Sequence, residues 1–216
     1  PNADGSALFA TGNTVAIATV YGPKELHPAN KRKPDRALIR CEYTMLPFSV
    51  SERAKPGQNR RSKEIGMITE NALSAVVDLK RFPQSVIDVQ ILILQADAGT
   101  RCAGINAAAM ALAHAGIVMK EMVSSISIGK IDDKIVTDLT KEEEDWKEGE
   151  GATDIPFTLT SNTKECTHLQ LDGKIPAKRF KEVIDSAVIA CNKIFEIQKR
   201  SLKGEIINEN KTKEKK

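Results

Sequence analysis

The residues best suited to chemistry form a short polar segment, DAGTR, at residues 97–101. The apolar run VIDVQILIL precedes this segment and an alanine-rich stretch follows it, which predicts a buried strand, a loop and then a helix. Backbone N–H groups at a helix start, a glycine that lets a ligand approach, the Thr100 hydroxyl and the Arg101 guanidinium are together suited to an anion. The loop is therefore predicted to hold a free phosphate or a phosphodiester.

A second interpretation of the same loop stays open. The P-loop pattern GxxxxGK[ST] does not occur in the sequence, and Thr100 can act as a simple helix cap. Local features alone therefore leave anion binding and helix capping with equal weight.

Acidic residues form a second polar group in the segment DWKEGEGATD, which begins at Asp145 and ends at Asp154. Asp154 comes directly before the apolar run IPFTLT, and the start of a strand is a rigid place from which to present a carboxylate. Carboxylates with water ligands are what Mg²⁺ or Mn²⁺ prefers, and such a metal can neutralise the charge that develops when a phosphodiester is displaced. Acids in a loop are usually just solvated, so Asp154 is the better of the two predicted ligands.

Charge is distributed unevenly along the chain, although the net charge is only +3. Residues 22–63 hold eleven Lys and Arg against four Asp and Glu, whereas residues 132–154 hold ten acids against three bases. Within the basic region, Arg60 and Arg61 open a predicted helix after a proline–glycine loop, and adjacent arginines on a rigid helix start suit phosphate groups. The basic region is predicted to contact a polyanion, although a solvated face is the ordinary explanation of a charge run.

Hydrophobic periodicity predicts the elements that position these residues. Strands are expected at residues 6–12, 14–23, 37–48, 86–95, 124–131, 134–139, 154–160 and 165–171, and helices at residues 60–77, at 104–115 and from about 176 onward. The order indicates an α+β (mixed α/β) domain in which helices cover one side of a sheet. Such a fold class names no chemistry by itself.

Length and composition indicate the domain organisation, the location of the protein and the state of its cysteines. A chain of 216 residues with 41% hydrophobic content can bury a full core, and we expect one domain over residues 1–202 followed by a charged, disordered tail at 203–216. No apolar run approaches the length of a membrane span, so we expect a cytoplasmic protein without a membrane partner. The four cysteines are widely spaced, which predicts reduced thiols and neither a disulfide framework nor a zinc site.

Five motifs occur in a fixed order: YGPKE, PFSV, RRSKEI, QADAGTR and DIP. In this combination the chain resembles the RNase PH family, and in particular the catalytic ring subunits of the archaeal exosome. The resemblance runs from about residue 1 to about residue 202, and the family segment that usually precedes NADGS is missing. It implies the RNase PH fold, which is related to the second domain of ribosomal protein S5.

The resemblance also implies a reaction and an assembly. Members of the family degrade single-stranded RNA by attack of inorganic phosphate on the terminal 3′ phosphodiester, release nucleoside diphosphates, and add 3′ tails in reverse. The expected cofactor is Mg²⁺ or Mn²⁺, with phosphate as co-substrate. The expected partners are a non-catalytic RNase PH-like paralogue, in a hexameric ring of three heterodimers, and cap proteins with S1 or KH domains.

Five residues of these motifs match positions that bind phosphate or RNA in the family. Gly99, Thr100 and Arg101 match the family's phosphate-binding motif, and would hold the attacking phosphate. Arg60 and Arg61 match the paired arginines that contact the RNA backbone near its 3′ end.

Four further residues match acidic or RNA-contacting positions of the family. Asp154 matches the second of two catalytic aspartates and Asp145 the first, as metal ligands or acids. His27 and Tyr43 lie in stretches that resemble segments near the RNA path. A histidine in a loop is otherwise simply exposed, and a tyrosine within a strand is more often part of the core.

Two departures and three alternatives accompany this interpretation. The loop before Asp154 is longer than the family pattern, so Glu148 or Glu150 can replace Asp145 as the first acid. Gln84 stands where relatives commonly have arginine. The alternatives are a non-catalytic RNA-binding ring subunit, a hydrolytic nuclease, and a homohexameric RNase PH that trims transfer RNA. Because GTR and TDIP occur together, the catalytic, phosphate-using interpretation is favoured.

Overall fold

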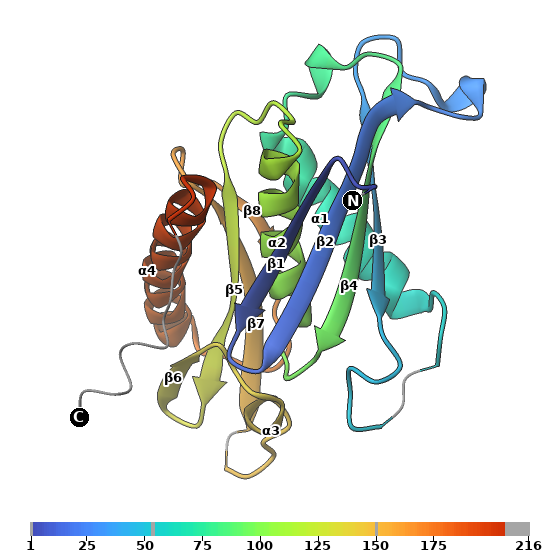
Figure 1. Ribbon diagram of the computed structural model, residues 1–216. Helices are drawn as coiled ribbons and strands as arrows, with labels where there is room; N and C mark the ends of the chain where they lie inside the picture. The colour runs from blue at the N-terminus through green and yellow to red at the C-terminus, as the bar shows by residue number, and fades with distance from the viewer. Residues whose placement is uncertain (1, 53–54, 150, 206–216) are drawn as a thin grey trace.

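Eight strands form two four-stranded sheets in the computed structural model, which describes residues 2–52, 55–149 and 151–205 (Figure 1). The first sheet has the order β1-β2-β4-β3, and its strands are β1 (Gly5–Thr11), β2 (Thr14–Glu25), β4 (Ser85–Gln95) and β3 (Leu38–Met45). The second has the order β6-β5-β7-β8, and its strands are β6 (Lys134–Thr137), β5 (Val123–Ile131), β7 (Ala152–Thr160) and β8 (Cys166–Leu169).

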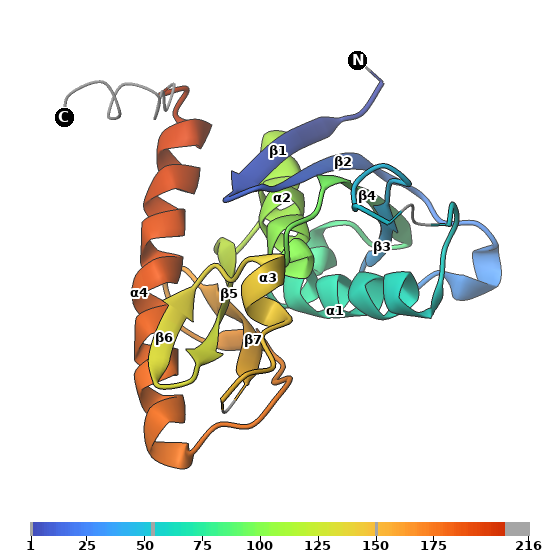
Figure 2. The same ribbon diagram turned by 90° about the horizontal axis from the view of Figure 1, so that it is seen from below.

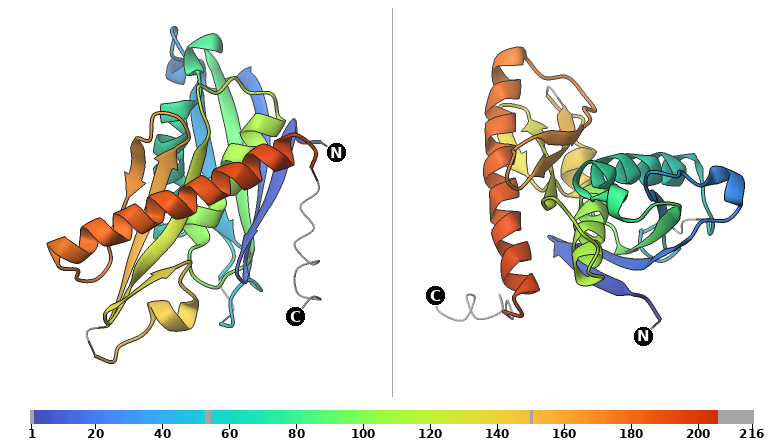
Figure 3. Two further views of the ribbon diagram at one scale, coloured as in Figure 1. Left: turned by 90° about the vertical axis from the view of Figure 1, so that its left-hand side faces the viewer. Right: turned by 90° about the horizontal axis from the view of Figure 1, so that it is seen from above.

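Helices and sheets alternate in layers (Figure 2). Helices α1 (Arg60–Val76) and α2 (Thr100–His114) cover the inner face of the first sheet, and α2 also contacts β5 of the second. Helix α4 (Ala177–Leu202) runs obliquely across the other face of the second sheet (Figure 3). The short helix α3 (Lys141–Glu144) lies near the start of β7. The described part of the chain also has 3-10 turns at Ala29–Lys31 and Leu79–Arg81. The predicted α+β class is confirmed.

Burial along the strands follows from these layers. In β2, Ala16, Ala18 and Val20 are fully buried while the alternating residues are partly exposed, as expected for a sheet with one covered face. Strand β5 is buried along nearly its whole length because α2 covers one face and α4 the other. The core therefore has two parts, one around α1 and α2 and one under α4.

Helix α2 connects the two parts of the core. Its residues are mostly small and buried, and a Cβ added to Gly104 would lie 3.1 Å from Ile91 of the first sheet. Toward the second sheet, the Asn106 side chain donates to the Ser125 carbonyl (2.7 Å) and accepts from the Ser125 N–H (2.9 Å). Both bonds are buried, so they fix α2 against β5.

Strand pairing decides which loops meet. Strand β2 is antiparallel to β4, with Val15 opposite Gln95, so the β1–β2 hairpin lies at the end of the sheet where β4 leads into α2. In the second sheet, Gly129 of β5 is opposite Asp154 of β7. A side chain at Gly129 would overlap the backbone oxygen of Thr153, so glycine permits the close pairing beside Asp154.

Several expectations from the sequence differ in detail. The strands divide between two sheets, α2 begins at Thr100 rather than at residue 104, and α3 occupies part of the predicted acidic loop. All four cysteines are free. No helix within residues 2–52, 55–149 and 151–205 is both long and apolar enough to cross a membrane. Most of the predicted tail, residues 206–216, lies outside the described residues.

Candidate active site

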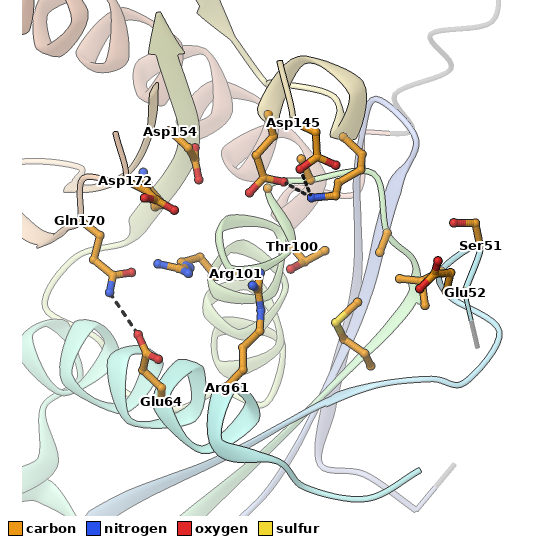
Figure 4. Close-up of a pocket in the computed structure, with 18 of the residues that line it drawn as sticks. Ser51, Glu52, Arg61, Glu64, Thr100, Arg101, Asp145, Asp154, Gln170 and Asp172 are labelled. Atoms are coloured by element: carbon orange, nitrogen blue, oxygen red, sulfur yellow. Dashed lines mark hydrogen bonds and ion pairs between the residues drawn. The ribbon is translucent and has the colours of Figure 1, made fainter. Parts of the chain in front are cut away.

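A cavity of about 900 Å³ opens where the starts of α1 and α2 face α3 and β7 (Figure 4). Its walls include six of the residues predicted from the sequence, namely Arg61, Gly99, Thr100, Arg101, Asp145 and Asp154. They also include polar residues for which no role is predicted from the sequence, among them Glu64, Lys141, Glu144, Gln170 and Asp172. The structure thus brings the predicted phosphate loop and the predicted acids into one space.

The phosphate loop is a sharp turn from β4 into α2. Ala98 and Gly99 both have positive φ angles, +56° and +58°, and Gly99 is the N-cap residue of α2 without a side-chain capping bond. Successive left-handed residues favour glycine and turn the backbone within a very short distance. The N-terminus of α2 is therefore directed at the cavity with its backbone donors and positive dipole end.

Tyr43 supports this loop from behind. The Tyr43 hydroxyl donates to Thr100 Oγ1 over 2.9 Å, and the two residues are 1% and 6% exposed. Burial raises the pKa of the Tyr43 phenol, so the hydroxyl stays neutral and remains a donor. The expectation that Tyr43 contacts RNA is corrected accordingly, because a side chain enclosed in the core is not accessible to a polymer.

Two arginines face the cavity from different helices (Figure 4). Arg61 lies in the first turn of α1, whose N-cap residue Asn59 accepts from the Ser62 N–H, and Arg101 lies in the first turn of α2. Within the part of the chain that the structure describes, neither guanidinium forms an ion pair with a carboxylate. Both charges are therefore free to bind an anion. Arg60 precedes Arg61 but does not line the cavity.

Asp154 is held by its neighbours on both sides of β7. Ser127 Oγ of β5 donates to Asp154 Oδ1 (2.5 Å), and the backbones of Asp154 and Asp172 exchange two hydrogen bonds of 2.8 and 2.9 Å. Burial raises the pKa of Asp154 and the charge of Glu144 adds to this, against the Ser127 hydrogen bond and the attraction of Arg101. A cation beside Asp154 would relieve the cost of its buried charge.

Asp145 follows α3 directly and is more exposed, with 61% of its side chain accessible. Lys141 Nζ lies 2.9 Å from Asp145 Oδ1 and 3.2 Å from Glu144 Oε2. The helix starts at a capping box, in which Thr140 accepts from the Glu143 N–H and Glu143 accepts from the Thr140 N–H. This T-x-x-E spacing was the sequence signal for α3 that periodicity alone did not reveal.

The remaining acids bear on which residue is the first aspartate. Glu148 does not line the cavity, whereas Asp145 does. Glu150 lies outside the described residues. Asp145 is therefore the better placed of the two residues that can be compared.

Asp145 and Asp154 could hold a metal ion only if water or substrate phosphate supplies most of its other ligands. The described ranges contain no group of three or more His, Cys, Asp or Glu side chains arranged to hold a metal. Mg²⁺ is usually held by one or two carboxylates and keeps several waters or substrate phosphates as its other ligands. Asp145 and Asp154, which face one cavity, fit that mode, and the raised pKa of Asp154 indicates a carboxylate that lacks full charge compensation.

His27 and Gln84 lie away from the cavity. The end of β2 pairs with the start of β4, so the loop after β2 is at the opposite end of the first sheet from the phosphate loop, toward the top of Figure 1. His27 is in that loop with Nε2 3.6 Å from Glu25 Oε2. Gln84 adopts a positive φ of 60° beside it, and its N–H donates to the Lys33 carbonyl. The structure does not bring His27 together with the other predicted site residues.

Hydrogen bonds join the phosphate loop to its surroundings through residues without an assigned role. Asp97 Oδ1 accepts from the Lys141 N–H (2.7 Å) and Asp97 Oδ2 accepts from Asn13 Nδ2 (2.9 Å). Thr14 Oγ1 accepts from the Asp97 N–H (2.9 Å) and donates to the Ala98 carbonyl (2.7 Å). Asn13 lies between the two strands predicted at residues 6–12 and 14–23, but these hydrogen-bond partners are distant in sequence and only the fold pairs them.

Comparison with known proteins gives consistent results. Residues 1–118 match the model of the 3′ exoribonuclease family, domain 1, and residues 121–190 match domain 2 of the same family. The exosome complex component Rrp41 of Thermococcus kodakarensis is 46% identical over 202 residues, which are 94% of this chain and 80% of that protein. Its counterpart from Methanopyrus kandleri is 43% identical over 201 residues, 93% of this chain and 82% of that protein.

Solved structures share the fold. Rice Rrp46 superposes with a TM-score of 0.82 at 22% identity, covering 94% of this chain and 90% of that one. A chain of the Archaeoglobus fulgidus exosome with RNA bound to the active site gives a TM-score of 0.72 at 22% identity, covering 91% of this chain and 84% of that one. The expected RNase PH fold is thereby confirmed, and the chain belongs to the RNase PH family of 3′ exoribonucleases.

Proposed function

We propose that this chain is the catalytic ring subunit of an archaeal exosome, which shortens single-stranded RNA from its 3′ end by phosphorolysis. The observation that carries the proposal is a single cavity that unites a phosphate-type loop, two arginines without an ion pair among the described residues, and two aspartates. A non-catalytic ring subunit needs none of these, and a hydrolase, whose nucleophile is water, needs no separate anion cradle.

The loop at Gly99, Thr100 and Arg101 binds the attacking phosphate. Backbone N–H groups at the start of α2, the Thr100 hydroxyl and the Arg101 guanidinium supply donors. Tyr43 donates to Thr100 Oγ1, so the Thr100 hydroxyl proton is left for the ligand. The phosphate is thereby oriented before the reaction begins.

Phosphorolysis exchanges one bond to phosphorus for another. A phosphate oxygen attacks the terminal phosphorus, the bond from that phosphorus to the 3′ oxygen of the preceding nucleotide breaks, and that oxygen takes a proton. The products are a nucleoside diphosphate and an RNA shorter by one nucleotide. Because phosphate is already a nucleophile, the protein mainly aligns the groups and neutralises charge. Excess nucleoside diphosphate drives the same step in reverse and adds a 3′ tail.

Asp145 and Asp154 would hold Mg²⁺ or Mn²⁺, which neutralises charge on the reacting phosphoryl group when it is bound. Ser127 fixes the orientation of Asp154, and Lys141 fixes that of Asp145. Burial raises the pKa of Asp154, which favours its protonated form. If the metal is held elsewhere, protonated Asp154 is the general acid that would donate a proton to the departing 3′ oxygen.

RNA is held by charge rather than by sequence. Arg61 faces the cavity and Arg60 lies beside it on the start of α1, so we assign both to the RNA backbone near the 3′ end. Contacts from arginine to phosphate carry no base information. The enzyme should therefore degrade single strands with little regard to sequence.

We infer that the chain works in the cytoplasm within a hexameric ring, alternating with a non-catalytic RNase PH-like paralogue beneath cap proteins with S1 or KH domains. Its archaeal relatives are named exosome complex components. Leu8 on β1 and Ile189 on α4 are 61% and 59% exposed. Large exposed apolar side chains are typical of protein–protein contacts, which supports assembly into a ring.

The test is RNA decay by this chain co-purified with its paralogue, on 5′-labelled single-stranded RNA with Mg²⁺, with and without inorganic phosphate. We expect phosphate-dependent shortening with release of nucleoside diphosphates, lost in Arg101→Ala, in Asp154→Ala and on addition of EDTA. Nucleoside monophosphates released without phosphate would indicate hydrolysis. Binding without decay would indicate a scaffold subunit, and an active hexamer of this chain alone would indicate a homohexameric RNase PH.

A further inference from the structure

We propose that Asp97 is a positioning residue that holds the phosphate loop, the β1–β2 hairpin and the acidic α3 segment in one arrangement. This inference rests on the proposed function, because the elements that it joins carry the phosphate-binding and acidic residues. Asp97 does not line the cavity. Its two carboxylate oxygens bond to two different segments, Lys141 at the start of α3 and Asn13 in the hairpin.

The link to α3 extends to Asp145 through a single residue. Lys141 is bound at its backbone N–H by Asp97 (2.7 Å) and binds Asp145 with its side-chain ammonium (2.9 Å). The Asp145 side chain is 61% exposed and α3 is only four residues long, so packing does little to fix this carboxylate. The hydrogen-bonded chain from Asp97 through Lys141 therefore sets where Asp145 lies relative to the phosphate loop.

Asp97 itself rests on a rigid support. Thr14 is 1% exposed, and its hydroxyl bonds to the N–H of Asp97 and to the carbonyl of Ala98. These two bonds hold Ala98 in its left-handed conformation, which is unfavourable for a residue with a side chain. The turn that presents Gly99 and the carboxylate that holds α3 are thus anchored by the same buried hydroxyl.

The hairpin also reaches the second aspartate. Thr11 Oγ1 donates to Asp138 Oδ2 (2.6 Å), and the Asp138 N–H donates to the Ser127 carbonyl (2.8 Å). Ser127 in turn bonds to Asp154. The hairpin therefore connects to Asp145 through Asn13 and Asp97, and to Asp154 through Thr11 and Asp138.

The donor and acceptor pattern at Asp97 allows a sharp test. Both partners of the carboxylate are donors, namely a backbone N–H and the amide of Asn13. Asn13→Asp would place a second carboxylate beside that of Asp97. The two negative charges repel each other, so the hydrogen bond between the hairpin and Asp97 should be lost. Asp97→Asn combined with Asn13→Asp restores a donor–acceptor pair in reversed order and keeps an acceptor for the Lys141 N–H. Asp97→Asn alone should be mild, because the Asn13 amide can turn over to accept.

The experiment measures phosphate-dependent RNA decay by the assembled ring and hydrogen exchange at the Lys141 amide in the same variants. We expect Asn13→Asp to lower kcat about tenfold and to speed exchange, while KM for RNA changes little. The double variant should return both quantities to within about threefold of wild type. Asn162→Asp, in the β7–β8 connection beside Glu121, is the matched control and should change neither.

Each outcome decides the inference. A double variant no better than Asn13→Asp, or Asn13→Asp with wild-type kcat and exchange, overturns it. Equal losses in kcat and RNA affinity, with a lowered melting temperature in all variants, would show general destabilisation and also overturn it. If RNA decay by the wild-type ring does not depend on phosphate, the proposed function is wrong. The hydrogen-exchange rates at the Lys141 amide would still decide whether Asp97 holds Lys141.

Discussion

Tyr43, near the end of β3, donates a buried hydrogen bond of 2.9 Å to Oγ1 of Thr100, the first residue of α2. Tyr43→Phe removes only this hydroxyl, so Thr100 loses its donor and can rotate. We expect KM for phosphate to rise severalfold and the free energy of unfolding to fall by about 1 kcal/mol. Phosphate-dependent kinetics and thermal unfolding measure the two effects. Tyr21→Phe, at the other tyrosine of the chain, is the control, and a loss confined to RNA affinity would contradict the assigned role.

Arg101 should matter for phosphate more than for RNA. Its guanidinium faces the cavity from α2 and forms no ion pair with another described residue. Arg101→Ala should lower phosphate-dependent turnover about 10²- to 10³-fold, the usual effect of removing one preorganised donor. RNA binding, measured by fluorescence anisotropy, should weaken much less. Arg179→Ala, which removes an exposed arginine of α4 paired with Glu182, should leave turnover unchanged.

Asp154 should destabilise the chain at neutral pH. Because burial raises its pKa above the ordinary 3.8, the folded state binds more protons than the unfolded state between these two values. The contribution of Asp154 to stability is therefore largest below pH 3.8 and is lost as the pH rises through its folded pKa. Asp154→Asn is neutral throughout, so it should melt at a higher temperature than wild type at pH 7, by a margin that shrinks toward pH 4.

Asp154→Asn should lower activity although it should raise stability. Asp154→Asn should lower phosphate-dependent decay about a hundredfold or more, since a carboxylate can hold a metal or move a proton and an amide cannot. Asp133→Asn, at a side chain that is 88% exposed, is the control for both measurements. A variant that melts lower than wild type at pH 7 would argue that the Ser127 bond outweighs burial.

Gly129 should be intolerant of any side chain. A Cβ at this position would overlap the Thr153 carbonyl oxygen and lie 2.8 Å from Leu139 Cδ1. Gly129→Ala should cost about 1–3 kcal/mol of stability and reduce activity, because β5 and β7 would separate beside Asp154. Urea unfolding measures the first effect. Gly104→Ala is a graded comparison and should be milder, since its Cβ would lie 3.1 Å from the Ile91 methyl and 3.8 Å from the Tyr43 ring, with no backbone atom among these neighbours.

Features set by local sequence were predictable. Helix α1 was expected at residues 60–77 and spans Arg60–Val76, because its apolar residues recur at helical spacing and Asn59 caps it. The phosphate loop and Asp154 were located for a related reason, since each adjoins a long apolar strand whose end is easily recognised in sequence. Helix α2 was expected four residues too late because small residues carry little amphipathic signal.

Features set by contacts between distant segments were not predictable. The division of the strands between two sheets depends on which segments α2 covers, and periodicity does not encode that choice. Tyr43 was expected near the RNA path from its sequence context. That context does not reveal that its hydroxyl is buried against Thr100, which only the fold shows. Asp97 stood in the motif, but its partners Asn13 and Lys141 are brought to it by two other connections.

Helix α2 is shared by both sheets, and Asn106 fastens it to β5 by two buried bonds. The cavity is lined by Thr100 and Arg101 from the first part of the chain and by Asp145 and Asp154 from the second. A folding intermediate with only the first sheet in place would therefore hold the phosphate loop without its acidic wall, and the complete cavity forms only once the second sheet packs against α2.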